Sequence, residues 1–171
     1  GLLTAKALKI EALAVPVSCN TAIEKSELFS TVERTKIGSP YVIAEFEKLA
    51  TKYKSIAGFE ANGGFLLGSD ITINGKALKA LPTRDAVLPA IMLFTMAKEK
   101  GIAKAVNELP ARFTQSDRIK DFATEKSKSL LAKYQSEPES LLNKVGITNK
   151  VIETNTLDGL RMTLDNNDIV H

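Results

Sequence analysis

The chain has 171 residues and a mass of 18.5 kDa, which suits one medium domain or two small ones, and its 44% hydrophobic and 25% charged residues are ordinary for a folded protein. The net charge of +3, from 23 basic and 20 acidic side chains, is too small an excess to predict a nucleic-acid partner. One cysteine cannot form an internal disulfide, and no uncharged apolar run reaches the roughly 18 residues of a membrane span, so we expect a cytoplasmic protein without a membrane partner.

The first part of the chain alternates between strand-like and helical patterns. Ala7–Val17 is apolar and predicts a buried or edge strand, Asn20–Phe29 predicts a short helix, and Val32–Gly38 is strand-like or irregular. Ser39-Pro40 predicts the start of an amphipathic helix that ends near Lys54, because serine can cap a helix and proline at the first helical position loses no needed hydrogen bond.

The middle of the chain contains two turn signals and a second convincing helix. The apolar runs Ser55–Phe59 and Phe65–Leu67 flank a turn-forming cluster and predict a strand–loop–strand unit. Asn74-Gly75 predicts an exposed turn. Thr83–Lys100 predicts a helix whose apolar middle is well buried, and Pro89 requires that it begin late or kink.

The last part of the chain predicts one helix followed by short strands. Ala123–Gln135 has a helical pattern, Lys150–Thr156 is strand-like, and Leu160–Leu164 alternates between apolar and polar residues. Ile169–His171 begins a further strand, from which we expect that the polypeptide is cut inside a domain. The order of elements predicts an α/β unit, then a smaller α+β unit after a boundary near Glu108.

Conventional catalytic residues are few. His171 is the only histidine and lies at the mobile end of the chain, and Cys19 has no neighbouring base, so we expect it to be a small buried hydrophobe. One cysteine and one histidine do not make a transition-metal site, and Asp165–Asp168 lacks the glycine and the final carboxylate of a calcium loop. We therefore expect no catalytic residue and no metal ligand in this sequence.

One loop carries groups that suit the binding of a sugar. Glu60, Asn62, Gly63 and Gly64 lie on the turn between two apolar runs. A carboxylate accepts hydrogen bonds from neighbouring hydroxyls, an amide donates and accepts, and glycines let the backbone approach a ligand. The alternative is an ordinary type I′ hairpin turn at Asn62-Gly63 with Glu60 in water. Spacing alone leaves both interpretations open.

Several segments resemble the α-D-phosphohexomutase family, most closely its phosphomannomutase branch. GFEANGGFLLGSD (58–70) and LPTRDAVLPAI (81–91) resemble the third domain, and RTKIGSPYVI (34–43) resembles its Thr-x-x-Gly segment. LPARFTQSDRIKDF (109–122) and DGLRMTLDNNDIVH (158–171) resemble the opening part of the fourth domain. The resemblance implies an α/β domain III with a mixed sheet and flanking helices over 1–107, and a truncated α+β domain IV over 108–171.

The resemblance also implies an activity for the parent enzyme. Members of the family are isomerases of carbohydrate metabolism that interconvert hexose 6-phosphate and hexose 1-phosphate by phosphoryl transfer. They use a phosphoserine in the first domain, Mg²⁺ held by the second, and a hexose 1,6-bisphosphate intermediate. This sequence contains neither the phosphoserine surroundings nor the metal loop, and it ends where the phosphate-binding loop of the fourth domain is expected. We therefore expect the fragment to be inactive alone and to supply recognition of sugar hydroxyls.

The resemblance assigns substrate binding to particular residues. Glu60 and Asn62 occupy the positions of the family's Glu-x-Ser pair, with asparagine in place of serine, and Gly63 and Gly64 complete that loop. Gly64 stands where many members have histidine. Gly38 matches the glycine of the Thr-x-x-Gly segment, and Ser39 follows it, although Ser39 is also explained as a helix cap.

The partners implied are mannose or glucose phosphate and the missing domains of the same chain. We also expect that the isolated chain exposes apolar surface and forms a homodimer. The alternative function is a stand-alone carbohydrate- or protein-binding module without catalysis.

Overall fold

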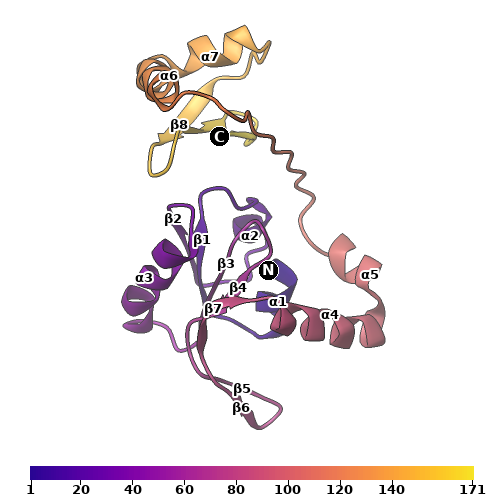
Figure 1. Ribbon diagram of the computed structural model, residues 1–171. Helices are drawn as coiled ribbons and strands as arrows, with labels where there is room; N and C mark the ends of the chain where they lie inside the picture. The colour runs from indigo at the N-terminus through magenta and orange to yellow at the C-terminus, as the bar shows by residue number, and fades with distance from the viewer. The chain divides into compact units, whose positions relative to one another are not determined.

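The computed structural model describes all 171 residues, which form two compact units, Gly1–Thr114 and Gln115–His171 (Figure 1). The first unit extends beyond residue 107 because the segment after its last helix is tied back to the loop that precedes helix α2. Asn20 Nδ2 donates to the Arg112 carbonyl at 2.9 Å, and Arg112 Nε donates to Thr21 Oγ1 at 3.0 Å. Each unit has its own apolar core.

The first unit is built on a five-stranded sheet in the order β2-β1-β3-β4-β7. Its strands are β1 (Ala12–Pro16), β2 (Thr31–Thr35), β3 (Ile56–Phe59), β4 (Phe65–Leu67) and β7 (Leu81–Asp85). Strand β1 pairs in parallel with β2 and with β3, whereas β4 pairs antiparallel with β3 and with β7. The predicted mixed sheet is confirmed.

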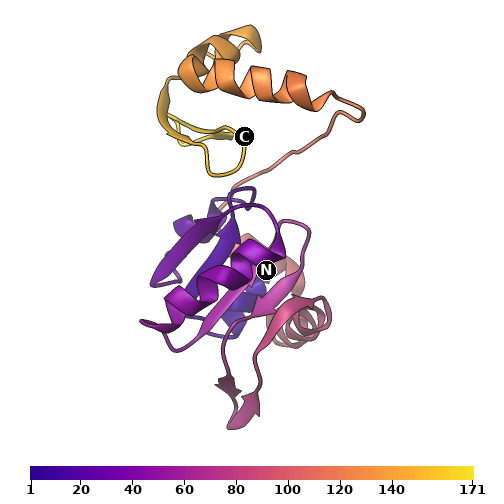
Figure 2. The same cartoon turned by 60° about the vertical axis from the view of Figure 1, so that its left-hand side comes forward.

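Helices cover both faces of this sheet. They are α1 (Leu2–Ala7), α2 (Ala22–Lys25), α3 (Ser39–Ala50) and α4 (Val87–Lys100), and the short helix α5 (Ile102–Asn107) packs against α4. Helix α3 packs on Ala12 and Ala14 of β1 through Val42, Phe46 and Leu49, and it lies in front of the sheet in Figure 2. These small strand residues give the helix a close approach to the sheet.

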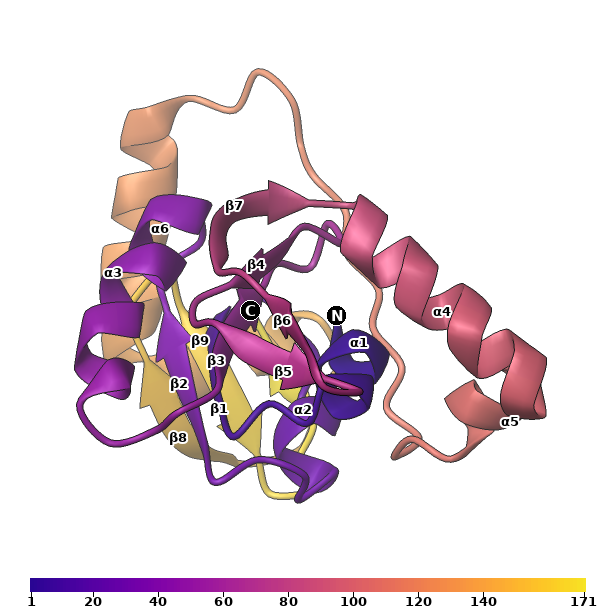
Figure 3. The same ribbon diagram turned by 90° about the horizontal axis from the view of Figure 1, so that it is seen from below.

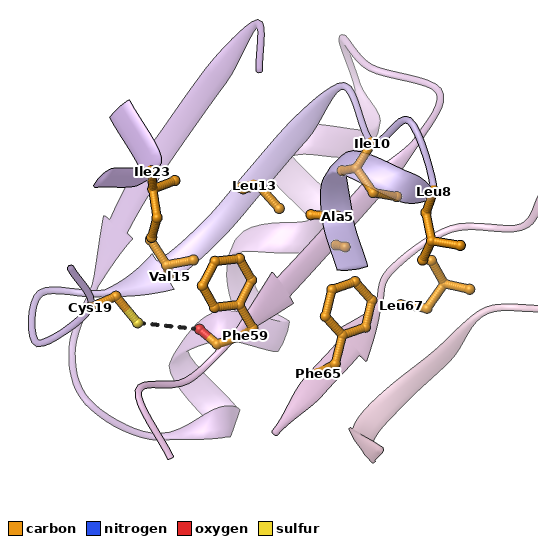
Figure 4. Close-up of a cluster of buried hydrophobic side chains, with 11 residues drawn as sticks. Ala5, Leu8, Ile10, Leu13, Val15, Cys19, Ile23, Phe59, Phe65 and Leu67 are labelled. Carbon is orange, nitrogen blue, oxygen red and sulfur yellow. Dashed lines mark hydrogen bonds between the residues drawn. The ribbon is translucent and has the colours of Figure 1, made fainter. Parts of the chain in front are cut away.

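The other face of the sheet carries a larger core. Leu13 and Val15 of β1 alternate with the two alanines and point into a cluster with Phe59 and Phe65, whose rings stack with centroids 6.4 Å apart (Figure 4). The Cys19 thiol in the same cluster donates to the Phe59 carbonyl at 3.6 Å. Burial raises the pKa of this thiol to about 11, so Cys19 is protonated at neutral pH and unreactive.

Between β4 and β7 the chain forms a separate two-stranded hairpin, β5 (Ile71–Ile73) and β6 (Lys76–Leu78). In Figure 3, which looks at the molecule from below, it lies in front of the five-stranded sheet. Asn74 and Gly75 form the predicted exposed turn, with φ of 50° and 77°. Positive φ at both positions is the signature of a type I′ turn.

The structure corrects one sequence prediction and decides between the two alternatives of another. The predicted strand Ala7–Val17 is helical at its start, because α1 ends at Ala7, and β1 begins at Ala12. The helix predicted from Thr83 begins late, at Val87, since the preceding residues form the edge strand β7. Asp85 Oδ1 accepts hydrogen bonds from two N–H groups of the first turn of α4, at 2.7 and 3.2 Å.

The expected burial of helix α4 is also wrong. Met96 is buried and faces the core with the partly buried Leu88 and Met92, three residues at i, i+4 and i+8. A second apolar stripe at i, i+4 and i+7 faces solvent, with Val87 66%, Ile91 55% and Phe94 72% exposed. Helix α4 is therefore apolar on two faces. The first unit covers one of them, and the other is exposed to solvent.

The second unit is a small α+β domain. Helices α6 (Thr124–Ser136) and α7 (Pro138–Lys144) accompany an antiparallel sheet of β8 (Val151–Asn155), β9 (Arg161–Leu164) and β10 (Ile169–Val170), in the order β10-β9-β8. Its core consists of Tyr134, Leu142, Leu160, Met162 and Leu164. The alternation predicted for β9 is confirmed. In neither unit is any helix long and apolar enough to cross a lipid bilayer.

Candidate functional site

Three connections meet at one edge of the five-stranded sheet. Strands β2 and β3 run parallel to β1, so the segments that follow them emerge at the same edge. Strand β4 starts at that edge and β7 ends there, because each is antiparallel to its neighbour. The edge therefore collects Ser39 after β2, Glu60 after β3 and Arg84 at the end of β7, in the position where ligands bind in open α/β sheets.

The β3–β4 loop has a defined backbone conformation. Glu60 N–H donates to the Gly64 carbonyl, and Gly63 N–H donates to the Glu60 carbonyl, both at 3.0 Å. Gly63 has φ of 93°, whereas Asn62 keeps a negative φ. This is a three-residue loop with a type I turn and a glycine bulge. The alternative of a type I′ turn at Asn62-Gly63 is therefore wrong.

The carboxylate of Glu60 is buried, with 8% of the residue exposed, and is held through one oxygen. Oε2 accepts a hydrogen bond from Ser39 Oγ at 2.7 Å and lies 3.3 Å from Arg84 Nε. Oε1 makes no hydrogen bond within the protein. Glu60 is thus not a solvated turn residue, because a buried carboxylate persists only with such partners.

Ser39 serves this carboxylate and not its own helix. It is the first residue of α3, and no side-chain hydrogen bond caps that helix. The interpretation of Ser39 as a helix cap is therefore wrong. The N-terminal end of α3 carries partial positive charge, which favours the nearby anion of Glu60. Gly38 precedes it with φ of 128°, a conformation that residues with a side chain avoid.

Asn62 and Gly64 lie beside this group, on the exposed side of the loop. Asn62 Oδ1 accepts the Gly64 N–H at 3.0 Å, so the amide oxygen stabilises the loop. The Asn62 amide nitrogen makes no hydrogen bond within the protein and remains available to donate. A Cβ atom at Gly64 would lie 3.1 Å from Arg84 Nε and 3.3 Å from Asn62 Oδ1, which places all three residues together.

Arg84 is the residue of this site that the sequence interpretation missed. The interpretation placed it in a helix, where its neighbours would not have included Glu60. The available signal was strand pairing, because Phe65 at the start of β4 pairs with Asp85, next to Arg84. A polar edge strand that contains a proline shows little alternation, and so this signal is weak.

Nowhere in the chain do three or more His, Cys, Asp or Glu side chains come together in a way that could hold a metal ion. The acidic run Asp165–Asp168 instead makes local contacts. Asp165 accepts from Asn149 Nδ2, and Asp168 accepts from Asn166 Nδ2, both at 2.8 Å. The residues present therefore do not fit a magnesium site.

Residues 2–115 match the family model described as phosphoglucomutase/phosphomannomutase, alpha/beta/alpha domain III. The chain belongs to this family. It is 52% identical to a phosphomannomutase of Salmonella muenchen and 37% identical to one of Sinorhizobium fredii, in each case over 100% of this chain and 36% of the relative. The chain thus spans about a third of the length of the curated relatives it matches.

A solved structure has the same fold. The crystal structure of a putative phosphomannomutase from Thermus thermophilus matches 95% of this chain and 32% of its own, with a TM-score of 0.55. The two sequences are 13% identical. At this identity the similarity concerns the fold alone.

Proposed function

We propose that this chain is the sugar-recognition part of a phosphomannomutase-type phosphohexomutase, which interconverts hexose 6-phosphate and hexose 1-phosphate. The observation that carries the proposal is the Glu60 carboxylate, fixed through Oε2 by Ser39 with Oε1 left open, at the ligand-binding edge of the sheet. Two relatives that align over the whole chain are named phosphomannomutases, which supports the same activity.

In this proposal each residue of the loop has a role toward the hexose. Oε1 of Glu60 accepts a hydrogen bond from a ring hydroxyl, and the Asn62 amide nitrogen donates to a neighbouring one. Gly63 and Gly64 expose backbone that a sugar can approach closely. Gly38 turns the chain so that the Ser39 hydroxyl reaches Glu60 and holds its carboxylate in one orientation.

The transfer chemistry of the proposed enzyme lies outside these residues. A phosphoserine, Mg²⁺ and a hexose 1,6-bisphosphate intermediate belong to the proposed whole enzyme, where a bound metal ion would supply charge neutralisation from residues outside this chain. This chain contributes positioning, since it has no cluster of metal ligands. We therefore expect no turnover by the 171-residue chain alone.

The exposed stripe of α4 supports a proposal about partners. Val87, Ile91 and Phe94 form an apolar surface that the unit itself does not cover. We assign it to contact with other domains of a longer, cytoplasmic chain, because the relatives are almost three times as long as this sequence. In the isolated chain the same surface is free to pair with a second copy, and sedimentation at rising concentration is expected to show a dimer.

Turnover assays test the proposed function. The longer protein is expected to convert mannose 6-phosphate or glucose 6-phosphate to the 1-phosphate, and the isolated chain neither. A longer protein without mutase activity, whose isolated chain still binds sugar, would favour the alternative of a stand-alone binding module. Activity of the isolated chain would contradict the assignment of the chemistry to other domains.

A further inference from the structure

The Glu60 loop is accompanied by a cation with unused donors. Arg84 lies on the edge strand β7, and its side chain is 58% exposed. Its Nε lies 3.3 Å from Glu60 Oε2, while neither terminal nitrogen makes a hydrogen bond or ion pair with the protein. The guanidinium is therefore tethered at one point and presents its remaining N–H groups to solvent beside the open oxygen Oε1.

Gly64 makes room for this arrangement. A Cβ atom at position 64 would lie 3.1 Å from Arg84 Nε, which is closer than most Cβ contacts, and 3.4 Å from its Cγ. The arginine side chain thus lies directly over the backbone of Gly64. An arginine in contact with a carboxylate on one side and a bare loop on the other loses less rotamer freedom on binding than one without any contact.

The charges of the site favour a ligand that is both a polyol and an anion. Glu60 alone would repel a phosphoryl group, because like charges in one site are unfavourable. Arg84 offsets that charge and presents a planar pair of donors, which is the geometry that matches phosphate oxygens. Oε1 accepts from hydroxyls at the same place. The Glu60 oxygen accepts from the hydroxyls, and the Arg84 N–H groups donate to the phosphoryl oxygens. The site should therefore bind a sugar phosphate more tightly than a neutral sugar.

We propose that Arg84 is a second ligand-binding residue of this site, which contacts a phosphoryl oxygen and selects phosphorylated hexoses over neutral ones. The inference rests on the proposed function, because it assigns the hexose phosphate to the same loop. Arg84 acts in addition to Glu60, which binds hydroxyls whether or not the sugar is phosphorylated.

In the test, the ¹⁵N-labelled chain is titrated separately with mannose 1-phosphate, methyl α-mannoside and inorganic phosphate. Binding is measured from the shifts of the Gly63 and Gly64 amide signals. Arg84→Gln is expected to weaken binding of mannose 1-phosphate about tenfold, the effect of one charge-assisted contact, and to leave the affinity for methyl α-mannoside unchanged. Arg84→Lys is expected to be intermediate. Lys76→Gln, the same loss of charge on the exposed hairpin, is the matched control and should change neither affinity.

The outcomes separate this inference from the proposed function. If Arg84→Gln weakens both sugars equally, or neither, Arg84 only positions Glu60 and the inference is overturned. If inorganic phosphate still shifts the loop signals in Arg84→Gln, the anion binds elsewhere and the inference is also overturned. A third outcome is that mannose 1-phosphate binds no more tightly than inorganic phosphate and that Arg84→Gln weakens both. The role of Arg84 in binding a phosphoryl group would then be supported, and the proposed recognition of the hexose would be contradicted.

Discussion

The first unit contains the dipeptide Asn-Gly twice, each time between two antiparallel strands, and the two copies behave differently. Asn74-Gly75 closes the β5–β6 hairpin with positive φ at both residues. Asn62-Gly63 has positive φ only at the glycine, and its loop holds a buried carboxylate.

The difference arises from loop length and from neighbours distant in sequence. Ile73 pairs directly with Lys76, so two residues must reverse the chain, and the type I′ turn seen here matches the strand twist. The β3–β4 loop has one more residue, so positive φ is needed only at Gly63. The Asn62 side chain accepts a hydrogen bond from the Gly64 N–H. The extra length gives Glu60 the room to meet Ser39, so the same dipeptide is a plain turn in one place and part of a site in the other.

The largest expected effect follows from removing the carboxylate of the first loop. In the longer protein, Glu60→Ala should lower kcat/KM about 10²-fold or more, because charged hydrogen bonds to the sugar are worth roughly 1.5–3 kcal/mol each. Asp70→Ala, which removes a carboxylate at the base of the other hairpin, is the control and should leave kcat/KM unchanged. Equal kinetics for Glu60→Ala and wild type with both hexose phosphates would remove the loop from the mechanism.

Alanine at the two turn glycines tests what the loops share. Gly63→Ala and Gly75→Ala should each lower the free energy of unfolding by about 1–2 kcal/mol, since both glycines have positive φ, at 93° and 77°. Only Gly63→Ala should also weaken sugar binding. Urea titrations followed by the amide signals of β3 and β5 measure the first quantity. A binding loss in Gly75→Ala would show that the two loops are not independent.

Glycine in place of each asparagine should change the free energy of unfolding by a smaller amount, and by a different amount in the two turns. Asn74→Gly should be tolerated or slightly stabilising, because glycine adopts positive φ freely. Asn62→Gly should cost about 1 kcal/mol, because it removes the hydrogen bond to Gly64 and adds backbone freedom in the unfolded chain. The same urea titration measures both, and the opposite order of stabilities would contradict the assigned turns.

The smallest effect concerns pH at the base of the β5–β6 hairpin. The Lys79 ammonium and the Ala80 N–H lower the pKa of Asp70, and Asp70 in turn raises the pKa of Lys79. The pair therefore contributes stability between about pH 4 and about pH 10; it is lost as pH falls through the lowered pKa of Asp70 or rises through the raised pKa of Lys79. A ¹³C carboxyl titration should place Asp70 below the ordinary value, and Lys79→Gln should move it upward. If the titration midpoint of Asp70 were the same in Lys79→Gln as in the wild type, the ion pair between Asp70 and Lys79 would be contradicted.

Local patterns in the sequence were sufficient for much of the fold. Ser39-Pro40 marked the start of α3, and the alternation of Met162 and Leu164 marked a half-buried strand. These signals are short-range, because helix starts and strand alternation depend on adjacent residues. The exposed face of α4 was not predictable, because an apolar stripe looks the same whether its own domain or another covers it.

The candidate site was predictable in part for the same reason. The composition of the loop indicated sugar binding, but the pairing of Glu60 with Ser39 spans 21 residues, and that with Arg84 depends on the order of the strands. A polar run with a proline did not reveal that Leu81–Asp85 is a strand, so Arg84 was assigned to a helix.

Adjacent residues connect the site to the uncovered side of α4. Asp85 fixes the first turn of that helix through two backbone N–H groups, and the next residue back along the chain is the arginine beside Glu60. A displacement of helix α4 would therefore act directly on the backbone that carries this arginine. Arg84 and Val87, the first residue of the exposed apolar stripe, are three positions apart, so the stripe and the Glu60 site share one short stretch of backbone.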